Sequence, residues 1–372
     1  MSSQNNSSNS SVSSSPSSST SSRKKLLRLF HLRDPAVQAQ KKQFSWGSHL
    51  GSGTYGEVSK CVWKTHQPKM DVAIKVVPKS KVPNQEQQEK LLNHTLELQH
   101  PHIVSLHHWF HSRHHYYMVF ELAQGGELFD HIIAHGRFNE ADTRKMITDL
   151  TSAVVHIHSQ NIVHRDLKPE NLFVRGSGPI FSAPFDLLLA DFGVAVILPT
   201  PNSMINGVCG SPGYTAPEVY QRKPYGKAVD IWSLGVITFI LLCGRFPFAK
   251  LSGPEFLEEL SEQMRKSKNG SIRLPKAFGL SKEAEEFIGG CLQLDPERRL
   301  TAEEALNHKW LVGKDPITQT PKSSINPSLS TEESDLEVIE FPTHQSTLQE
   351  SNLAEVRFCR TRTISEGPRA AM

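Results

Sequence analysis

The apolar pattern of the chain changes from strand-like to helix-like at about Gly125. Between Phe44 and Val77, short runs of β-branched and aromatic residues are interrupted by glycines, as in "FSWGSHLGSGTYGEVSKCVW" and "DVAIKVV". Two further runs of this kind precede Gly125, separated from the first by a charged helical stretch over 84–99. Such runs with glycine between them predict an antiparallel sheet.

Helical spacing dominates after Gly125. In the segment 139–160, Asn139 is a suitable N-cap, and apolar residues recur every three or four positions at Ile147, Leu150, Val154 and Ile157. The pattern therefore predicts an α+β fold in which a small β-rich lobe is followed by a larger helical lobe. A cleft between two such lobes is the expected place for a ligand.

Composition sets the limits of the folded part. Residues 1–22 are mostly Ser with no charge, and from about Val312 the chain is rich in Ser, Thr, Pro and Glu. Segments of this composition bury too little apolar surface to fold. We expect a disordered Ser-rich and basic extension over 1–43, a folded domain over 44–311 and a largely disordered tail over 312–372.

Charge and cysteine usage exclude several classes of protein. The net charge of +3 is small for 372 residues and gives no indication of a nucleic-acid partner. The longest apolar run, Ile231–Gly244, is too short to span a bilayer and predicts a buried core helix. Five scattered cysteines without a C-x-x-C pair indicate a reducing compartment, with a cytoplasmic and also a nuclear location open: Cys61, Cys209, Cys243, Cys291 and Cys359.

A glycine-rich segment, "LGSGTYGEV" from Leu50 to Val58, lies in the first lobe. Its glycines have G-x-G-x-x-G spacing, which also occurs in ordinary tight hairpins. A strand follows the motif rather than a helix, so a flap that covers phosphates is favoured over a dinucleotide-binding fold. Lys75, at the end of "VAIK", is a charged side chain on an otherwise buried strand and requires an anion.

Two further motifs follow in the helical half. The segment "HRDLKPEN", His164–Asn171, occupies a loop after the predicted helix, and "DFG" follows at Asp191–Gly193. With the glycine loop and the strand lysine, they resemble the protein-kinase superfamily in content and order over about 44–310. The resemblance implies the bilobal kinase fold, ATP as the phosphoryl donor and Mg²⁺ as its companion ion.

The resemblance assigns roles to individual residues. Asp166 would accept the proton of the substrate hydroxyl, Lys168 would neutralise the moving phosphoryl group, and Asn171 and Asp191 would bind Mg²⁺. Lys75 would hold the α- and β-phosphates. The implied ATP-binding residues are Leu50, Gly51, Ser52, Gly53, Thr54, Tyr55, Gly56, Val58, Ala73, Lys75, Glu89, Glu121, Ala123, Glu127 and Phe173.

The chain departs from the family pattern at the partner of Lys75. A Glu on the helix after the lysine strand normally holds this side chain, and the usual count back from His100 reaches Leu91. Glu89 is the nearest acidic residue and the first candidate for this role, and Glu86 is the second.

The lysine of "HRDLKPEN" is similar to that of Ser/Thr kinases, in which Ser211 would help to accommodate the acceptor. The segments "GGELFDHI" and "YGKAVDIWSLGVITFILLCGRFPF" are most similar to the calcium/calmodulin-dependent kinase group. In that group two acids, matched here by Glu127 and Glu170, receive an Arg three residues before the acceptor, and paired carboxylates suit a guanidinium. The alternative for Glu127 is a contact with the ribose. Two buried ties are also expected, one between Glu218 and Arg299 and one from Asp230 to the catalytic loop.

The sequence leaves alternatives open for the regulation of the loop before Cys209. Related chains carry a phosphorylatable residue two positions before Cys209, where this chain has Gly207, although the phosphate-binding Arg165 is present. The alternatives are a loop held by unmodified contacts and a displaced acceptor at Thr200 or Ser203. In the tail, Thr363 and Ser365 each follow an Arg by three residues and are candidate phosphosites, a pseudosubstrate or sites for other kinases.

Candidate partners follow from the same reasoning. We expect protein substrates with basic Ser/Thr sites. The basic and apolar segment 22–33 is a candidate site for calmodulin, for a membrane surface or for an upstream kinase, and a solvated tail is the alternative. The tail over 312–372 contains no long basic amphipathic helix, which argues against direct calmodulin control there. The histidines between His107 and His115 lack coherent metal-ligand spacing. A pseudokinase scaffold and a small-molecule kinase are the competing hypotheses.

Overall fold

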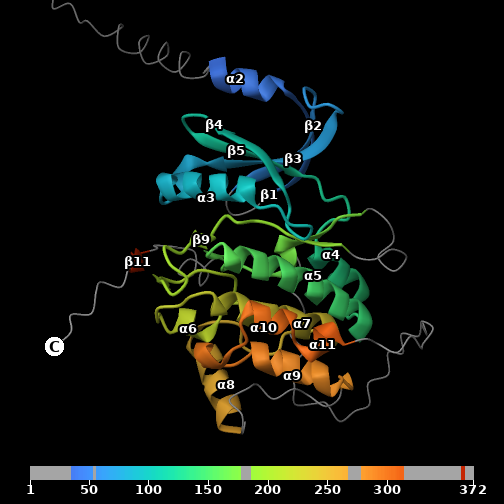
Figure 1. Cartoon of the computed structure of the whole chain (residues 1–372), viewed down its shortest axis with the longest axis vertical. Helices are drawn as coiled ribbons and strands as arrows, with labels where there is room; N and C mark the ends of the chain where they lie inside the picture. The colour runs from blue at the N-terminus through green and yellow to red at the C-terminus, as the bar shows by residue number, and fades with distance from the viewer. Residues whose placement is uncertain (1–34, 53–55, 177–185, 267–277, 314–361, 365–372) are drawn as a thin grey trace, which may run out of the picture.

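The computed structural model describes residues 35–52, 56–176, 186–266, 278–313 and 362–364. Figure 1 shows a small lobe with a sheet above a larger helical lobe, so the predicted bilobal α+β architecture is confirmed. Among the described residues, no helix is long and apolar enough to cross a membrane.

The small lobe contains a five-stranded antiparallel sheet with the order β1-β2-β3-β5-β4. Along β3 the side chains alternate between faces: Val72 and Ile74 are fully buried in a cluster with Phe44, while Ala73 and Lys75 point to the opposite face. The elements are β1 (Phe44–Ser52), β2 (Glu57–Trp63), β3 (Met70–Pro78), η1 (Lys79–Lys81), α3 (Gln85–Glu97), β4 (Leu106–His111) and β5 (His115–Glu121).

The segment before the sheet departs from the expected disorder, because Pro35–Lys42 forms the helix α2. Val37 is buried with Phe110 and Tyr117, and the Lys41 ammonium lies 4.3 Å from the centroid of the Tyr117 ring. The buried Val37, this cation–π contact and a hydrogen bond between Gln40 Oε1 and His108 Nε2 at 3.2 Å help to hold the helix on the sheet. Composition averaged over 1–43 concealed a short amphipathic segment at its end.

The large lobe contains most of the helices and three short two-stranded ladders. Its elements are α4 (Leu128–His135), α5 (Glu140–Ser159), β6 (Ile162–Val163), η2 (Pro169–Asn171), β7 (Leu172–Val174), β8 (Leu187–Leu189), β9 (Val196–Ile197), β10 (Met204–Asn206), α6 (Pro217–Tyr220), α7 (Ala228–Cys243), α8 (Gly253–Lys266), α9 (Lys282–Cys291), η4 (Pro296–Arg298), α10 (Ala302–Leu306), α11 (Lys309–Val312) and, from the tail, β11 (Arg362–Ile364).

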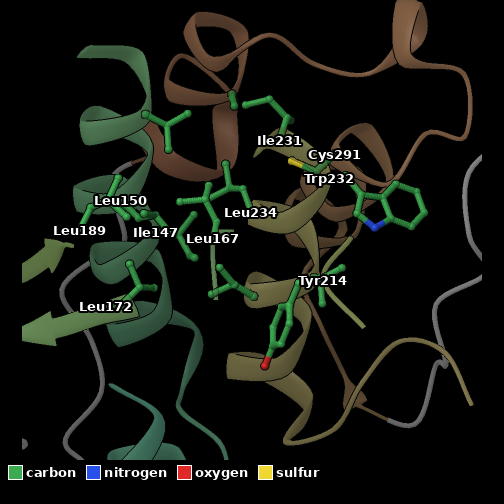
Figure 2. Packing of buried hydrophobic residues seen from close by; sticks show 14 of the residues in the cluster. Ile147, Leu150, Leu167, Leu172, Leu189, Tyr214, Ile231, Trp232, Leu234 and Cys291 are labelled. Atoms are coloured by element: carbon green, nitrogen blue, oxygen red, sulfur yellow. The ribbon is translucent and has the colours of Figure 1, made fainter. Parts of the chain in front are cut away.

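Helix α7 forms the centre of this lobe. All its residues from Val229 to Cys243 are buried, as expected for a helix that is apolar on every side, and Gly244 ends it with a left-handed φ of 71°. Figure 2 shows its Leu234 packed towards Ile147 and Leu150 of α5. On the other side, a Cβ on Gly235 would lie 2.7 Å from that of Cys291, so the glycine permits the close approach of α9. The predicted core helix and the N-cap of Asn139 on Asp142 are both present.

Candidate active site

Four polar side chains, predicted for catalysis, metal binding or substrate binding, meet in one network. Asp166 Oδ1 accepts a hydrogen bond from Ser211 Oγ at 2.8 Å, and Lys168 Nζ donates to the same hydroxyl at 2.7 Å. Lys168 Nζ also lies 3.4 Å from Asp166 Oδ2. Asn171 Nδ2 donates to the backbone oxygen of Asp166 at 2.7 Å and to its Oδ2 at 3.3 Å. The arrangement fixes a carboxylate beside an ammonium and a hydroxyl.

Asp230 at the start of α7 fixes the loop that carries this network. Its carboxylate is fully buried and accepts hydrogen bonds from the backbone N–H groups of His164 at 2.9 Å and Arg165 at 2.8 Å, and it lies 2.8 Å from His158 Nε2. Burial alone would raise the pKa of Asp230, but the His158 contact and the loop amides hold it below its usual range. The expected tie between the catalytic loop and the core helix is therefore present.

Lys168 keeps its charge in spite of burial. Burial acts to lower the pKa of its ammonium, but the carboxylates of Asp166 and Glu170 outweigh that effect, and the net pKa is raised. A cation held in this way beside the predicted base can neutralise negative charge that develops on a transferred group.

Lys75 on β3 forms an ion pair with Asp191 of the "DFG" triplet. Lys75 Nζ lies 2.5 Å from Asp191 Oδ1, and Lys75 forms no second ion pair among the described residues. Burial alone would raise the pKa of Asp191, but Lys75 and the backbone N–H of Gly193 lower it. The neighbouring Phe192 is buried and packs edge-on against His164, with the two ring centroids 5.1 Å apart.

The structure does not place Glu89, the first candidate, on Lys75. Glu89 Oε1 accepts from the hydroxyl of Tyr116 at 3.0 Å and lies 3.9 Å from Lys79 Nζ. Two residues on, Leu91 is buried in the main core cluster. Two residues along a helix correspond to a rotation of about 200°, so Glu89 and Leu91 lie on nearly opposite faces of α3. Glu86, the second candidate, pairs with Lys90 on an exposed face at 2.8 Å.

The usual count back from His100 reaches Leu91, an apolar residue that is buried in the main core cluster. Glu89 and Glu86 have other partners, so the structure does not support either as the partner of Lys75. The described part of the chain pairs Lys75 with Asp191 alone.

The described residues of the predicted nucleotide site lie on the sheet of the small lobe and at the start of the large lobe. Val58 pairs with Lys75 across β2 and β3, Ala73 pairs with Phe120 across β3 and β5, and Phe173 on β7 forms a bridge with Glu127. Gly51 and Ser52 lie at the end of β1, and Leu50 is half exposed. A Cβ on Gly56 would lie 2.0 Å from the oxygen of Val76, so this position tolerates only glycine. Gly53, Thr54 and Tyr55 lie outside the described residues.

This geometry agrees with the comparison with known proteins. A family model described as the protein kinase domain matches residues 44–311. The chain belongs to the protein kinase family. Calcium/calmodulin-dependent protein kinase cmkA of Emericella nidulans is 41% identical over 283 residues, which are 75% of this chain and 65% of cmkA.

Other relatives agree with this group. Myosin light chain kinase A of Dictyostelium discoideum is 38% identical over 73% of this chain and 88% of its own length. Calcium/calmodulin-dependent protein kinase type 1B of Homo sapiens is 38% identical over 71% of this chain and 74% of its own length. The protein is a serine/threonine kinase of the calcium/calmodulin-dependent group.

The segment between Asp191 and Glu218, called the activation segment below, has a defined backbone although position 207 carries no residue that can be phosphorylated. Gly207 has a φ of 112°, a conformation that side-chain-bearing residues rarely adopt. An acceptor residue at this position would therefore be strained in this arrangement. The backbone conformation at position 207 thus disfavours the Ser or Thr that related chains carry there.

Of the two displaced acceptors, Thr200 is exposed and Ser203 is buried. The Ser203 hydroxyl accepts from the backbone N–H of Thr200 at 3.1 Å and lies 2.8 Å from its hydroxyl. Ser203 closes a turn, and a protein kinase could reach it only if this turn opened. Thr200 remains the accessible candidate.

Arg165, the residue expected to bind a loop phosphate, has protein partners instead. Its guanidinium donates to the backbone oxygen of Val194 and to the hydroxyl of Tyr225, the latter at 3.3 Å, and its own φ is 69°. The sequence pattern gave no indication of Tyr225. These contacts hold the loop near Asp166 in the unmodified chain.

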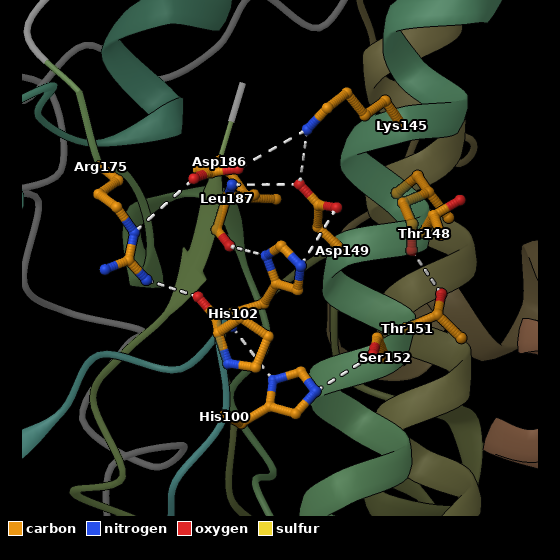
Figure 3. A network of polar contacts seen from close by, with 12 residues as sticks. His100, His102, Lys145, Thr148, Asp149, Thr151, Ser152, Arg175, Asp186 and Leu187 are labelled. Carbon is orange, nitrogen blue, oxygen red and sulfur yellow. Dashed lines mark hydrogen bonds and ion pairs between the residues drawn. The ribbon is translucent and has the colours of Figure 1, made fainter. Parts of the chain in front are cut away.

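A second polar network joins the loop between α3 and β4 to the large lobe. Figure 3 shows Arg175 and Asp149 on either side of His102. Asp149 Oδ1 lies 3.5 Å from His102 Nε2. Arg175 donates to the backbone oxygen of Pro101 at 2.5 Å and forms an ion pair with Glu121 at the end of β5. Burial raises the pKa of Asp149. The network fixes the loop between α3 and β4 on helix α5.

The same network predicts a pH dependence of stability through His100. Its Nδ1 accepts from the backbone N–H of His102 at 3.1 Å, so the neutral ring is the bonded form, and its Nε2 faces Ser152 Oγ. Burial, with the nearby His156 and His102, lowers the pKa of His100 from 6.5 to about 4. The unfolded chain thus binds this proton first as pH falls, and stability decreases from pH 6.5 towards 4.

We expect the His100→Asn variant, which retains an acceptor but does not titrate, to lose less stability than the wild type over this interval. Thermal unfolding at a series of pH values measures the slope. Equal slopes in the two proteins would show that His100 does not contribute.

Proposed function

We propose that this kinase transfers the γ-phosphoryl group of ATP to Ser or Thr residues of proteins that carry Arg three positions before the acceptor. Asp166 orients and deprotonates the acceptor hydroxyl, and Ser211 marks the place that this hydroxyl approaches. Lys168 balances the charge of the transferred group. The contact of Ser211 with both Asp166 and Lys168 is the observation that carries the proposal.

The chemistry of the side chains indicates which residues would bind the nucleotide and the metal ion. The carboxylate of Asp191 and the amide oxygen of Asn171 are hard ligands that suit Mg²⁺, and the amide nitrogen of Asn171 already donates to Asp166. Bound Mg²⁺ would supply charge neutralisation for the phosphates. Lys75 would exchange its contact with Asp191 for the α- and β-phosphates. Val58, Ala73 and Phe173 would enclose the base, and the backbone of Glu121–Ala123 would pair with its edge.

The preference for Arg is supported by the position of two acids. Glu127 is the N-cap residue of α4, and Glu170 lies in η2, against which α4 packs. The Glu170 carboxylate also acts on its surroundings: burial, Glu170 and Asp166 together raise the pKa of the Tyr214 phenol well above its usual value. Glu170 therefore lies near Tyr214 as well as in the catalytic loop.

A specificity measurement tests this assignment. In Glu170→Gln, kcat/KM for a Ser peptide with Arg at the third position before the acceptor is expected to fall by roughly 10- to 100-fold, the effect of a lost charge-assisted hydrogen bond. The peptide with Ala at that position should be affected little. If the ratio of the two kcat/KM values is the same in Glu170→Gln and wild type, the proposed recognition is wrong.

One observation favours the second candidate, a pseudokinase scaffold. Leu91 occupies the place of a carboxylate on α3, and Lys75 is held by the side chain that would bind Mg²⁺. The intact set of Lys75, Asp166 and Asp191 outweighs this observation, because phosphoryl transfer depends mainly on positioned charges and all three are present.

Regulation and location remain proposals. The names of cmkA and of the human relative attribute calmodulin dependence to those proteins. For this chain we expect no direct calmodulin control through 312–372, and the candidate segment 22–33 lies outside the described residues. The proposed location is cytoplasmic, with a nuclear pool open.

A further inference from the structure

The activation-segment strand β10 has two edges, and a different element occupies each. On one edge Ile205 exchanges both of its backbone hydrogen bonds with Tyr225: Ile205 N–H donates to Tyr225 O at 2.8 Å, and Tyr225 N–H donates to Ile205 O at 3.0 Å. The backbone groups of Ile205 are therefore committed to the body of the large lobe.

The tail strand β11 pairs with the other edge. Its register is antiparallel, with Met204 opposite Ile364, Ile205 opposite Thr363 and Asn206 opposite Arg362. Bonded and non-bonded pairs alternate in an antiparallel ladder. Since Ile205 bonds to Tyr225, the ladder bonds to the tail fall on Met204 and Asn206. Figure 1 shows β11 beside the helical lobe, although it is far from β10 in the sequence.

The paired strand is connected to the catalytic loop. Tyr225 accepts at its hydroxyl from Arg165, whose backbone N–H bonds to Asp230 and whose neighbour in the chain is Asp166. Gly207, with its glycine-favouring φ of 112°, follows β10 directly. A continuous set of contacts thus leads from the tail through β10 and Tyr225 to the residue beside the catalytic base.

We propose that the outer edge of β10 is a binding site for an extended peptide, and that the occupant is the chain's own segment Arg362–Ile364. Addition of a strand to an exposed sheet edge is a common mode of peptide recognition, in which main-chain hydrogen bonds supply the affinity. Here it holds the activation segment against Tyr225 at the place where position 207 cannot carry a phosphate. The tail is thus an activating clamp on the loop rather than a pseudosubstrate in the cleft.

Two proline variants of the full chain separate the ladder from other effects of the tail. Ile364→Pro removes an N–H that the register directs at Met204, whereas Thr363→Pro removes one that points away from β10. In Ile364→Pro, residue-resolved hydrogen exchange of the Met204 and Asn206 amides should accelerate by about five- to tenfold, the effect of one net hydrogen bond. The Ile205 amide, bonded to Tyr225, serves as the internal control and should keep its wild-type rate.

Activity should follow the same pattern. The kcat/KM of Ile364→Pro for a Ser peptide is expected to fall by a similar factor, and Thr363→Pro should match the wild type. Unchanged exchange at Met204 and Asn206 in Ile364→Pro, equal losses in both variants, or a rise in kcat/KM on loss of the strand would each overturn the proposal. A loss of protection on dilution of the wild type would make a second copy the occupant and contradict an intramolecular clamp. These readouts are independent of whether the kinase prefers Arg before the acceptor.

Discussion

The Asp166→Asn variant is expected to lower kcat by about 10²- to 10⁴-fold, the usual contribution of a positioned general base. The carboxylate of Asp166 is the acceptor for Ser211 Oγ at 2.8 Å, which indicates the direction from which a substrate hydroxyl would approach. Asn retains the shape of the side chain but cannot take up a proton at neutral pH. Initial rates at saturating ATP and peptide measure the effect.

The matched control is Asp71→Asn, which neutralises a half-exposed carboxylate in a surface pair with Lys60. Exposed pairs contribute little, so this variant should retain wild-type kcat. Both variants should unfold at the wild-type temperature. A kcat for Asp166→Asn within threefold of the wild type would remove Asp166 from the proposed role.

The Arg299→Met variant is expected to lose about 3–5 kcal/mol of unfolding free energy, the cost of leaving one partner of a buried ion pair without the other. Arg299 Nη1 and Nη2 donate to the two carboxylate oxygens of Glu218 at 2.7 and 3.1 Å, and both side chains are almost fully buried. The guanidinium also donates to Gln293 O at 3.0 Å and to Ala228 O at 2.8 Å, and lies 5.3 Å from the ring centroid of Trp232. Denaturant unfolding measures the loss.

The double variant Arg299→Met with Glu218→Gln provides the control. It removes the buried uncompensated carboxylate, so it should be more stable than Arg299→Met alone. If Arg299→Met alone loses less than about 1 kcal/mol, the range of a surface pair, then the ion pair does not hold the end of the activation segment.

Those parts of the site that depend on residue identity in an ordered motif were predictable from the sequence. The catalytic loop, the contacts of Asp230 with that loop and the pair between Glu218 and Arg299 were implied by the resemblance of their motifs to the kinase family. In the structure these buried charges have the partners that burial requires. The helices of the large lobe followed from apolar spacing and from caps such as Asn139.

The remaining features depend on geometry that spacing does not encode. Proximity in sequence favoured Glu89 as the partner of Lys75, but Glu89 contacts Tyr116 and Lys79, and Lys75 pairs with Asp191. Ser203 is a polar residue in a loop, a pattern typical of exposed sites, yet a turn with Thr200 buries it. The pairing of β11 with β10 joins segments far apart in the chain, and neither segment has a strand pattern long enough to predict it.

The central claim is that this chain is an active kinase for Ser and Thr in proteins. Transfer of label from γ-labelled ATP by the purified wild-type chain to a basic peptide tests it most directly, with a peptide that differs only by Ala in place of the acceptor Ser as the comparison. The account predicts Mg²⁺-dependent label on the Ser peptide and none on its Ala counterpart. Label on the Ser peptide no greater than that obtained with Asp166→Asn would contradict it and would favour the pseudokinase alternative.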